Sequence, residues 1–181
     1  MKIWRMEEIG DIYQFITVKD MDGHELLQFV DSLGTKRNTS EWIPLKIQIH
    51  RNKRRKICDY PGFVVPVFSE KAVDVIRDFL ISKADILPLD CGDERYFLIN
   101  VYNKVDCIDY DQAQYTKFDS GRVREFKKYA FKQEMLINEH IFKIPEIIGK
   151  SMVFVSDEFR NRVINNDLIG FNFIEVWDSE E

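Results

Sequence analysis

The sequence predicts an α+β protein in which many short strands form a mainly antiparallel or mixed sheet and a few helices pack against it. Three observations support this prediction. Short apolar or alternating runs separated by turn residues fill most of the 181 residues, only two segments have clear helical periodicity, and helices and strands do not alternate as in a parallel α/β sheet. A hydrophobic share of 45% and a charged share of 31% exclude a disordered chain.

The first part of the chain, residues 1–66, is predicted to consist mainly of short strands. Its clearest example is the run WIPLKIQIH, in which Leu45, Ile47 and Ile49 alternate with polar residues and so share one face of a strand. Pro44 confines this strand to a sheet edge or to a strand start. The expected elements are strands at residues 2–6, 11–18 and 42–50, a segment at 24–33 that fits neither template cleanly, and a polar loop at 34–40.

Two segments have the start signal and the periodicity of an amphipathic helix. Ser69 and Ser156 each stand at an N-cap position, where the hydroxyl can accept a hydrogen bond from a free backbone N–H group. Apolar residues then recur every three or four positions, and Asp157 and Glu158 place negative charge where the helix dipole favours it. We therefore expect helices near residues 69–82 and 156–167.

The C-terminal stretch from residue 151 to residue 177 is predicted to form a strand, the second helix, a turn and a last strand. Gly170 is expected to stop the helix. Phe159, Phe173 and Trp177 are expected to be core residues whose replacement would unfold the protein. Between the two helices, the expected elements are strands at 95–102 and 105–110, strands on both sides of the turn at 119–121, and extended pieces at 85–91, 127–131 and 140–144.

Charge and cysteine content bound the class of protein. A formal net charge of −5 argues against a general nucleic-acid binder. No apolar run approaches the length of a membrane span, and the first residues lack the apolar stretch of a secretory signal, so a cytoplasmic location is expected. Cys58, Cys91 and Cys107 include no C-x-x-C pair, which indicates reduced thiols. No cofactor and no metal are expected.

Two kinds of charged cluster keep alternative functions open. Acidic residues gathered at two places could hold a hard cation or supply the acid–base pair of a small hydrolase-like enzyme. The basic run at residues 51–56 could serve a nucleic-acid-binding accessory protein. Such clusters are more often solvated turns and loops, and the sequence has no H-E-x-x-H, G-x-S-x-G or Walker motif. The acidic residues are Asp90, Asp93 and Glu94 in the first cluster and Asp106, Asp109 and Asp111 in the second.

Several short motifs follow one another in the second half of the chain. They are LPLDC at 87–91, YFLINVYNKVDCIDYD at 96–111, FDSG at 118–121, KKYAFKQEML at 127–136, HIFKIPE at 140–146, FVSDEF at 154–159 and LIGFNFIEVWD at 168–178. In their order and spacing they resemble family eleven of the bacterial immunity proteins associated with polymorphic toxins, a myxobacterial-type immunity domain that was formerly a domain of unknown function. Lys143 stands where that family usually has Arg, and the pair Cys107 and Ile108 replaces a commoner Ala-Leu or Cys-Leu.

The resemblance implies an immunity protein that binds a cognate toxin in the cytoplasm and neutralises it by occlusion, without catalysis. Residues 1–181 would form a single domain, with a variable N-terminal part at 1–66 and a family-like part at 87–178. The negative net charge would suit a basic, nuclease-type toxin. Neither a membrane nor a nucleic acid is an expected partner, and the sequence leaves open whether the protein forms a homo-oligomer.

Residues that contact the toxin are expected on exposed loops. The shared motifs consist of strand, cap and turn residues, so they define a fold more than a binding surface. The charged loops of the N-terminal part and the first acidic turn are the remaining candidates. The candidate partner-binding residues are Lys36, Arg37, Glu41, Arg51, Arg54, Arg55, Asp90, Asp93 and Glu94.

Overall fold

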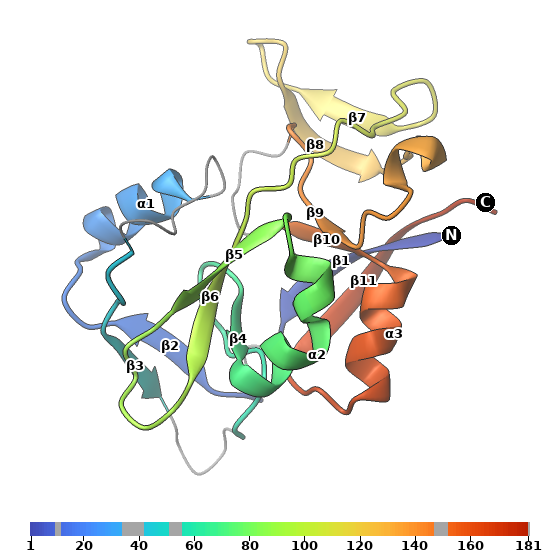
Figure 1. The fold of residues 1–181 in the computed structure, drawn as a ribbon. Helices are drawn as coiled ribbons and strands as arrows, with labels where there is room; N and C mark the ends of the chain where they lie inside the picture. The colour runs from blue at the N-terminus through green and yellow to red at the C-terminus, as the bar shows by residue number, and fades with distance from the viewer. Residues whose placement is uncertain (10–11, 34–41, 51–55, 147–151, 181) are drawn as a thin grey trace.

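A computed structural model describes residues 1–9, 12–33, 42–50, 56–146 and 152–180 of the chain. Within these ranges the backbone forms three α-helices and four small sheets, all of whose strand pairs are antiparallel (Figure 1). The predicted α+β class is therefore confirmed. The strands are divided among several small sheets and do not form one large sheet.

The helices and strands of the described ranges come in a fixed order along the chain. The helices predicted near residues 69–82 and 156–167 are confirmed as α2 and α3. None of the helices in these ranges has the length and apolarity that crossing a bilayer requires. The elements are β1 (Lys2–Glu8), β2 (Phe15–Val18), α1 (Gly23–Ser32), β3 (Ile47–His50), β4 (Val67–Ser69), α2 (Glu70–Leu80), β5 (Ala84–Pro88), β6 (Tyr96–Val101), β7 (Gln114–Lys117), β8 (Val123–Lys128), the 3₁₀ turn η1 (Gln133–Leu136), β9 (Ile141–Phe142), β10 (Val153–Ser156), α3 (Asp157–Asn165) and β11 (Phe171–Asp178).

The largest sheet has the strand order β11–β1–β10–β9. Its second strand comes from the beginning of the chain, and its other three strands come from the last third (Figure 1). Trp4 of β1 pairs with Val155 of β10 on one side and with Glu175 of β11 on the other. The strand–helix–strand unit predicted at the C-terminus therefore does not close on itself, because β1 lies between its two strands.

Helices α2 and α3 begin at the predicted serine caps. The Ser69 hydroxyl accepts a hydrogen bond from the Ala72 N–H group at 3.1 Å, and the Ser156 hydroxyl accepts one from the Phe159 N–H group at 3.3 Å. α3 packs on β1 and β10 of the largest sheet, while α2 packs between α3 and the three-stranded sheet β4–β6–β5. Local capping thus fixes where each helix starts, and the apolar faces of both helices are buried in the same core.

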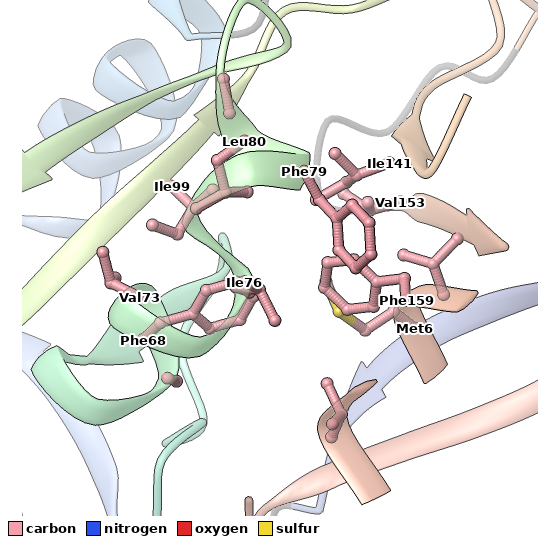
Figure 2. Packing of buried hydrophobic residues seen from close by; sticks show 14 of the residues in the cluster. Met6, Phe68, Val73, Ile76, Phe79, Leu80, Ile99, Ile141, Val153 and Phe159 are labelled. Carbon is pink, nitrogen blue, oxygen red and sulfur yellow. The ribbon is translucent and has the colours of Figure 1, made fainter. Parts of the chain in front are cut away.

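The main core lies between these helices and the sheets (Figure 2). The ring of Phe79 on α2 lies 5.9 Å from the ring of Phe159 on α3, measured between centroids. Met6 of β1 and Val153 of β10 belong to the same cluster and are at most 2% exposed. Phe159 is fully buried, as predicted, whereas Phe173 and Trp177 are only half-buried.

The segment whose pattern was ambiguous forms helix α1. Asp22 caps it in a capping box: its carboxylate accepts hydrogen bonds from the N–H groups of His24 and Glu25, and the Glu25 carboxylate accepts one from the Asp22 N–H group. No residue of α1 is buried. The cap, not a deeply buried face, explains why this stretch becomes a helix.

Gly170 does not have the predicted role of stopping α3. The helix ends at Asn165, and Asp167 already adopts a left-handed conformation with φ of 50°. Gly170 lies farther on with φ of 97°, where a Cβ atom would stand 2.7 Å from the carbonyl oxygen of Tyr60. A glycine is needed here because two backbone segments come close together.

The strand predicted at residues 105–110 is not formed. This segment pairs with neighbours at separate points: the Val105 N–H group donates to the Lys143 carbonyl at 2.9 Å, and the Cys107 carbonyl accepts from the Lys132 N–H group at 2.8 Å. Its buried residues face a second apolar cluster. The predicted strand is therefore wrong: the segment is held by separate hydrogen bonds and by burial of its apolar residues, and it is not part of a sheet.

Candidate functional site

Most of the predicted contact residues cannot be placed. They fall in two segments, after α1 and after β3, that lie outside the residues the structure describes. Their role in binding a partner stays a prediction. These residues are Lys36, Arg37, Glu41, Arg51, Arg54 and Arg55.

The acidic turn that contains the other three predicted residues connects β5 to β6. The Asp90 backbone forms two hydrogen bonds at the start of β3. Its N–H group donates to the Leu45 carbonyl, and its carbonyl accepts from the Ile47 N–H group, both at 2.9 Å. The side chains of Asp90 and Asp93 are exposed, and Glu94 is half-buried. The turn is therefore held by its backbone and presents two carboxylates to solvent.

A surface hollow of about 570 Å³ brings Asp93 and Glu94 near two further carboxylates. Asp59 accepts hydrogen bonds from the Ser69 hydroxyl at 2.7 Å and from the Ile169 N–H group at 2.9 Å. Glu70 forms an ion pair with Arg95 at 2.8 Å. Asp59 thus ties the start of α2 to the segment after α3, which is a structural use of a carboxylate.

The second acidic cluster also has the contacts of turn residues. The Asp109 carboxylate accepts hydrogen bonds from the Asp111 N–H group at 3.0 Å and from the Gln112 side-chain amide at 2.9 Å. Such bonds from an aspartate to the backbone two residues on are typical of a turn. Among the described residues, no group of three or more His, Cys, Asp or Glu side chains is arranged to hold a metal ion.

The three cysteines are free thiols, as predicted. Burial raises the pKa of both the Cys58 and the Cys107 thiol to about 12. Burial also raises the pKa of the half-buried Cys91 thiol, which donates a hydrogen bond to the Glu94 carbonyl at 2.8 Å. A nucleophilic cysteine requires the opposite shift, toward the thiolate.

The hairpin of β7 and β8, in the second half of the chain, is exposed. It stands out from the rest of the molecule at the top of Figure 1, and none of the residues in its two strands is buried. Residues 114–128 carry five basic and two acidic side chains, a formal net charge of +3 on a chain whose total is −5. We call residues 114–128 the basic hairpin. Its exposed basic residues are Lys117, Arg122, Arg124, Lys127 and Lys128.

Aromatic rings anchor the basic hairpin at its base. Phe126 of β8 stacks on Tyr129 with centroids 4.9 Å apart, and Tyr129 stacks on the buried Phe131 with an interplanar angle of 4°. Phe131 in turn packs edge-on against Trp177 of β11 at 5.7 Å. This row of rings joins the hairpin to the largest sheet and fixes its direction.

A hollow of about 500 Å³ opens beside the hairpin. Tyr110 and Tyr115 line it with their rings 5.3 Å apart, and the Lys117 ammonium lies 5.4 Å from the Tyr115 ring centre. The Tyr110 hydroxyl donates to the Glu146 carboxylate at 2.7 Å. Desolvation and this bond to a carboxylate raise the pKa of Tyr110, so the phenol stays protonated and remains a donor.

This surface was not predicted from the sequence, because the segment was interpreted only as two strands around a turn. The signal was present in the alternation of aromatic and basic residues over residues 115–129. Recognising the surface required the knowledge that no other sheet of the described residues covers the hairpin, since the same alternation in a covered sheet would describe a core face and a solvated face.

Comparison with known families identifies the family that the second half of the chain resembles. Residues 90–178 match the model of the Immunity protein family (Imm11). No curated protein matches the chain. The matched range begins at the acidic turn, contains the basic hairpin and α3, and ends with the last residue of β11.

Proposed function

The chain carries an Imm11 immunity protein family domain over residues 90–178, and we propose that it binds and neutralises a cognate bacterial toxin. The family match is the observation that carries this proposal. The match covers three strands of the largest sheet, β9, β10 and β11, together with helix α3. The family implies a toxin as the partner, and the chemistry of the toxin is left to experiment.

Neutralisation would occur by occlusion, without turnover and without a cofactor. The described carboxylates at Asp59 and Asp109 hold backbone and side-chain donors of the protein itself. The thiols have a pKa shifted away from the reactive form. These contacts support a binding protein over the hydrolase-like alternative, because a catalytic group needs to be available to a substrate.

The protein would act in the cytoplasm of the cell that makes it. Three free cysteines suit a reducing compartment, where thiols are not driven to form disulfides. An immunity protein is needed in that compartment when the toxin acts there. Cell fractionation with an antibody against the untagged protein would test the location.

The test of the function is a titration against the purified product of the neighbouring open reading frame. The toxin's activity is first established by its effect on cell growth and then followed in vitro while the immunity protein is added. Occlusion predicts that activity falls linearly and vanishes near molar equivalence, and that the two proteins co-elute as a stoichiometric complex.

Two results would contradict the proposal. A toxic neighbour that neither binds the protein nor loses toxicity in its presence would remove the immunity function. Full protection by a small fraction of a molar equivalent would instead indicate turnover, and the enzymatic alternative would replace occlusion.

A further inference from the structure

We propose that the basic hairpin is the element that contacts the toxin, and that it docks into an acidic cleft of that partner. This inference rests on the proposed function, because it names the surface and the partner chemistry of the same interaction. It differs from the expectation drawn from net charge alone, which favoured a basic toxin. The sign of the total charge does not decide the matter, because the charge is distributed unevenly.

The uneven charge is the first argument. The basic hairpin has a formal charge of +3, so the rest of the chain has −8. All five of its cations are exposed, and within the ranges described none of them forms an ion pair. Other cations of the protein, such as Lys83 with Glu139 at 2.6 Å, do have a carboxylate partner. The hairpin cations therefore remain available to an external acidic surface.

The shape and the mounting of the hairpin are the second argument. A projecting two-stranded element suits a concave partner, and an isolated hairpin of this kind is only marginally stable in water. Here the rings of Phe126, Tyr129 and Phe131 stack in a row at its base. The hairpin is thus ordered before it meets a partner, which lowers the entropy lost on binding.

The composition of its surface is the third argument. Interface residues that dominate binding energy are enriched in tyrosine and arginine, and both types occur here beside an open hollow. Tyr110 is 42% exposed and Phe118 is 44% exposed. Arg124 lies over the Phe118 ring at 5.8 Å from its centre. A cation and a ring held together in this way can insert as one unit into a complementary site.

A protein partner is favoured over a nucleic acid. Asp119 lies in the hairpin turn, Glu125 lies on β8, and Glu146 borders the hollow. Carboxylates at these places would repel a phosphate backbone, and the remaining −8 charge of the chain would oppose it further. The carboxylates of an acidic protein cleft stand at separate positions, so they can face the hairpin cations without lying opposite the hairpin's own carboxylates.

The experiment measures binding of the purified neighbouring gene product to wild-type protein and to the double variant Arg122→Glu/Arg124→Glu, at about 50 and 300 mM salt. Two charge reversals in a contact surface are expected to weaken binding about 100-fold or more at low salt, mainly through a slower association rate. Phe118→Ser is expected to weaken binding about 10-fold, chiefly by faster dissociation.

The matched control is Lys19→Glu/Lys46→Glu, which changes the net charge by the same amount. Both lysines are exposed and belong to the β2–β3 region, away from the hairpin (Figure 1). The control is expected to keep affinity within about 3-fold of wild type. Thermal unfolding of all variants verifies that they are folded, and a hairpin variant that lost its fold would be replaced by Lys117→Glu alone.

The outcomes separate the two proposals. If wild-type protein binds and protects while the folded hairpin variants bind equally well, the hairpin inference is wrong and the proposed function stands. If wild-type protein neither binds nor protects, both fail. If a 20-nucleotide single-stranded RNA used as a competitor binds through Arg122 and Arg124 more tightly than the protein partner does, the hairpin is a nucleic-acid surface and the inference is overturned.

Discussion

Replacing Gly170 by alanine tests the close approach between this residue and the backbone of Tyr60. The residue has φ of 97°, and an added Cβ would lie 2.7 Å from the Tyr60 carbonyl oxygen and 3.0 Å from the Cys58 Cβ. The left-handed conformation alone costs a non-glycine residue about 1–2 kcal/mol. Neither contact atom is the free end of a flexible side chain, so the backbone must shift, at a further cost of about 1–3 kcal/mol.

The shift would also disturb hydrogen bonds that join the two segments. The Asp59 N–H group donates to the Ile169 carbonyl at 2.8 Å, and the Ile169 N–H group donates to the Asp59 carboxylate at 2.9 Å. Because both bonds lie next to the clash, we expect Gly170→Ala to lower the free energy of unfolding by about 2–5 kcal/mol in total. Urea unfolding followed by tryptophan fluorescence measures the change.

Gly121→Ala is the matched control for this experiment. Gly121 has φ of 83°, and a Cβ added there would have no neighbour within 4 Å. Its substitution carries the conformational cost of about 1–2 kcal/mol without the steric one, and both variants gain the same small benefit from a less flexible unfolded chain. Equal destabilisation of the two variants would refute the close approach at Gly170.

Three further predictions concern the core, a buried carboxylate and the thiols. Phe159→Ala should lower the free energy of unfolding by about 3–5 kcal/mol, whereas Ile164→Ala on the same helix, at a side chain 49% exposed, should lower it by less than about 1 kcal/mol in urea unfolding; similar losses would contradict the packing of α3. Asp59→Asn should lower the free energy of unfolding by about 1–3 kcal/mol, because the amide cannot accept hydrogen bonds from both the Ser69 hydroxyl and the Ile169 N–H group. An unchanged urea midpoint would show that these two hydrogen bonds are not formed. Cys58 and Cys107 should resist iodoacetamide at pH 8 until urea is added, as checked by mass spectrometry of the labelled peptides. Burial raises the pKa of both thiols from 9.0 to about 12, so folding favours the neutral thiol. The stability that this provides is complete below pH 9 and is lost as pH rises from 9 toward 12. If a variant with both cysteines replaced by alanine has the same alkaline unfolding curve as wild type, the thiols are not a source of this pH dependence.

Much of the helical structure could be read from the sequence, because its signals act over a few residues. A serine followed by an apolar repeat places the start of α2 and of α3, and the caps at Ser69 and Ser156 are formed as expected. The family resemblance could also be read in advance, since it depends on the order of short motifs. For α1 the local signal was present as well, because Asp22 and Glu25 have the spacing of a capping box and form its reciprocal bonds. The apolar residues of this segment fitted neither a helix nor a strand, so the signal was not used.

The candidate surface could be predicted only in part. Exposed loops and turns can be named from sequence, and the turn at Asp90 was found in this way. The basic hairpin could not be recognised, because the pattern of its residues does not reveal whether another sheet covers it. Its exposure depends on where β7 and β8 lie relative to the rest of the chain, and the rings of Tyr129 and Phe131 that mount it also belong to the interior.

By itself, the sequence determined the fold class, the starts of α2 and α3 and the family of the second half of the chain. Each of these follows from interactions between residues close together in the chain. Only the tertiary structure decided that β1 lies between β10 and β11, that Gly170 meets Tyr60 and that the hairpin projects uncovered. The first two features join residues more than a hundred positions apart, and the third depends on no other described element covering the hairpin. Hydrogen bonds and burial between such distant residues produce no pattern in the local sequence.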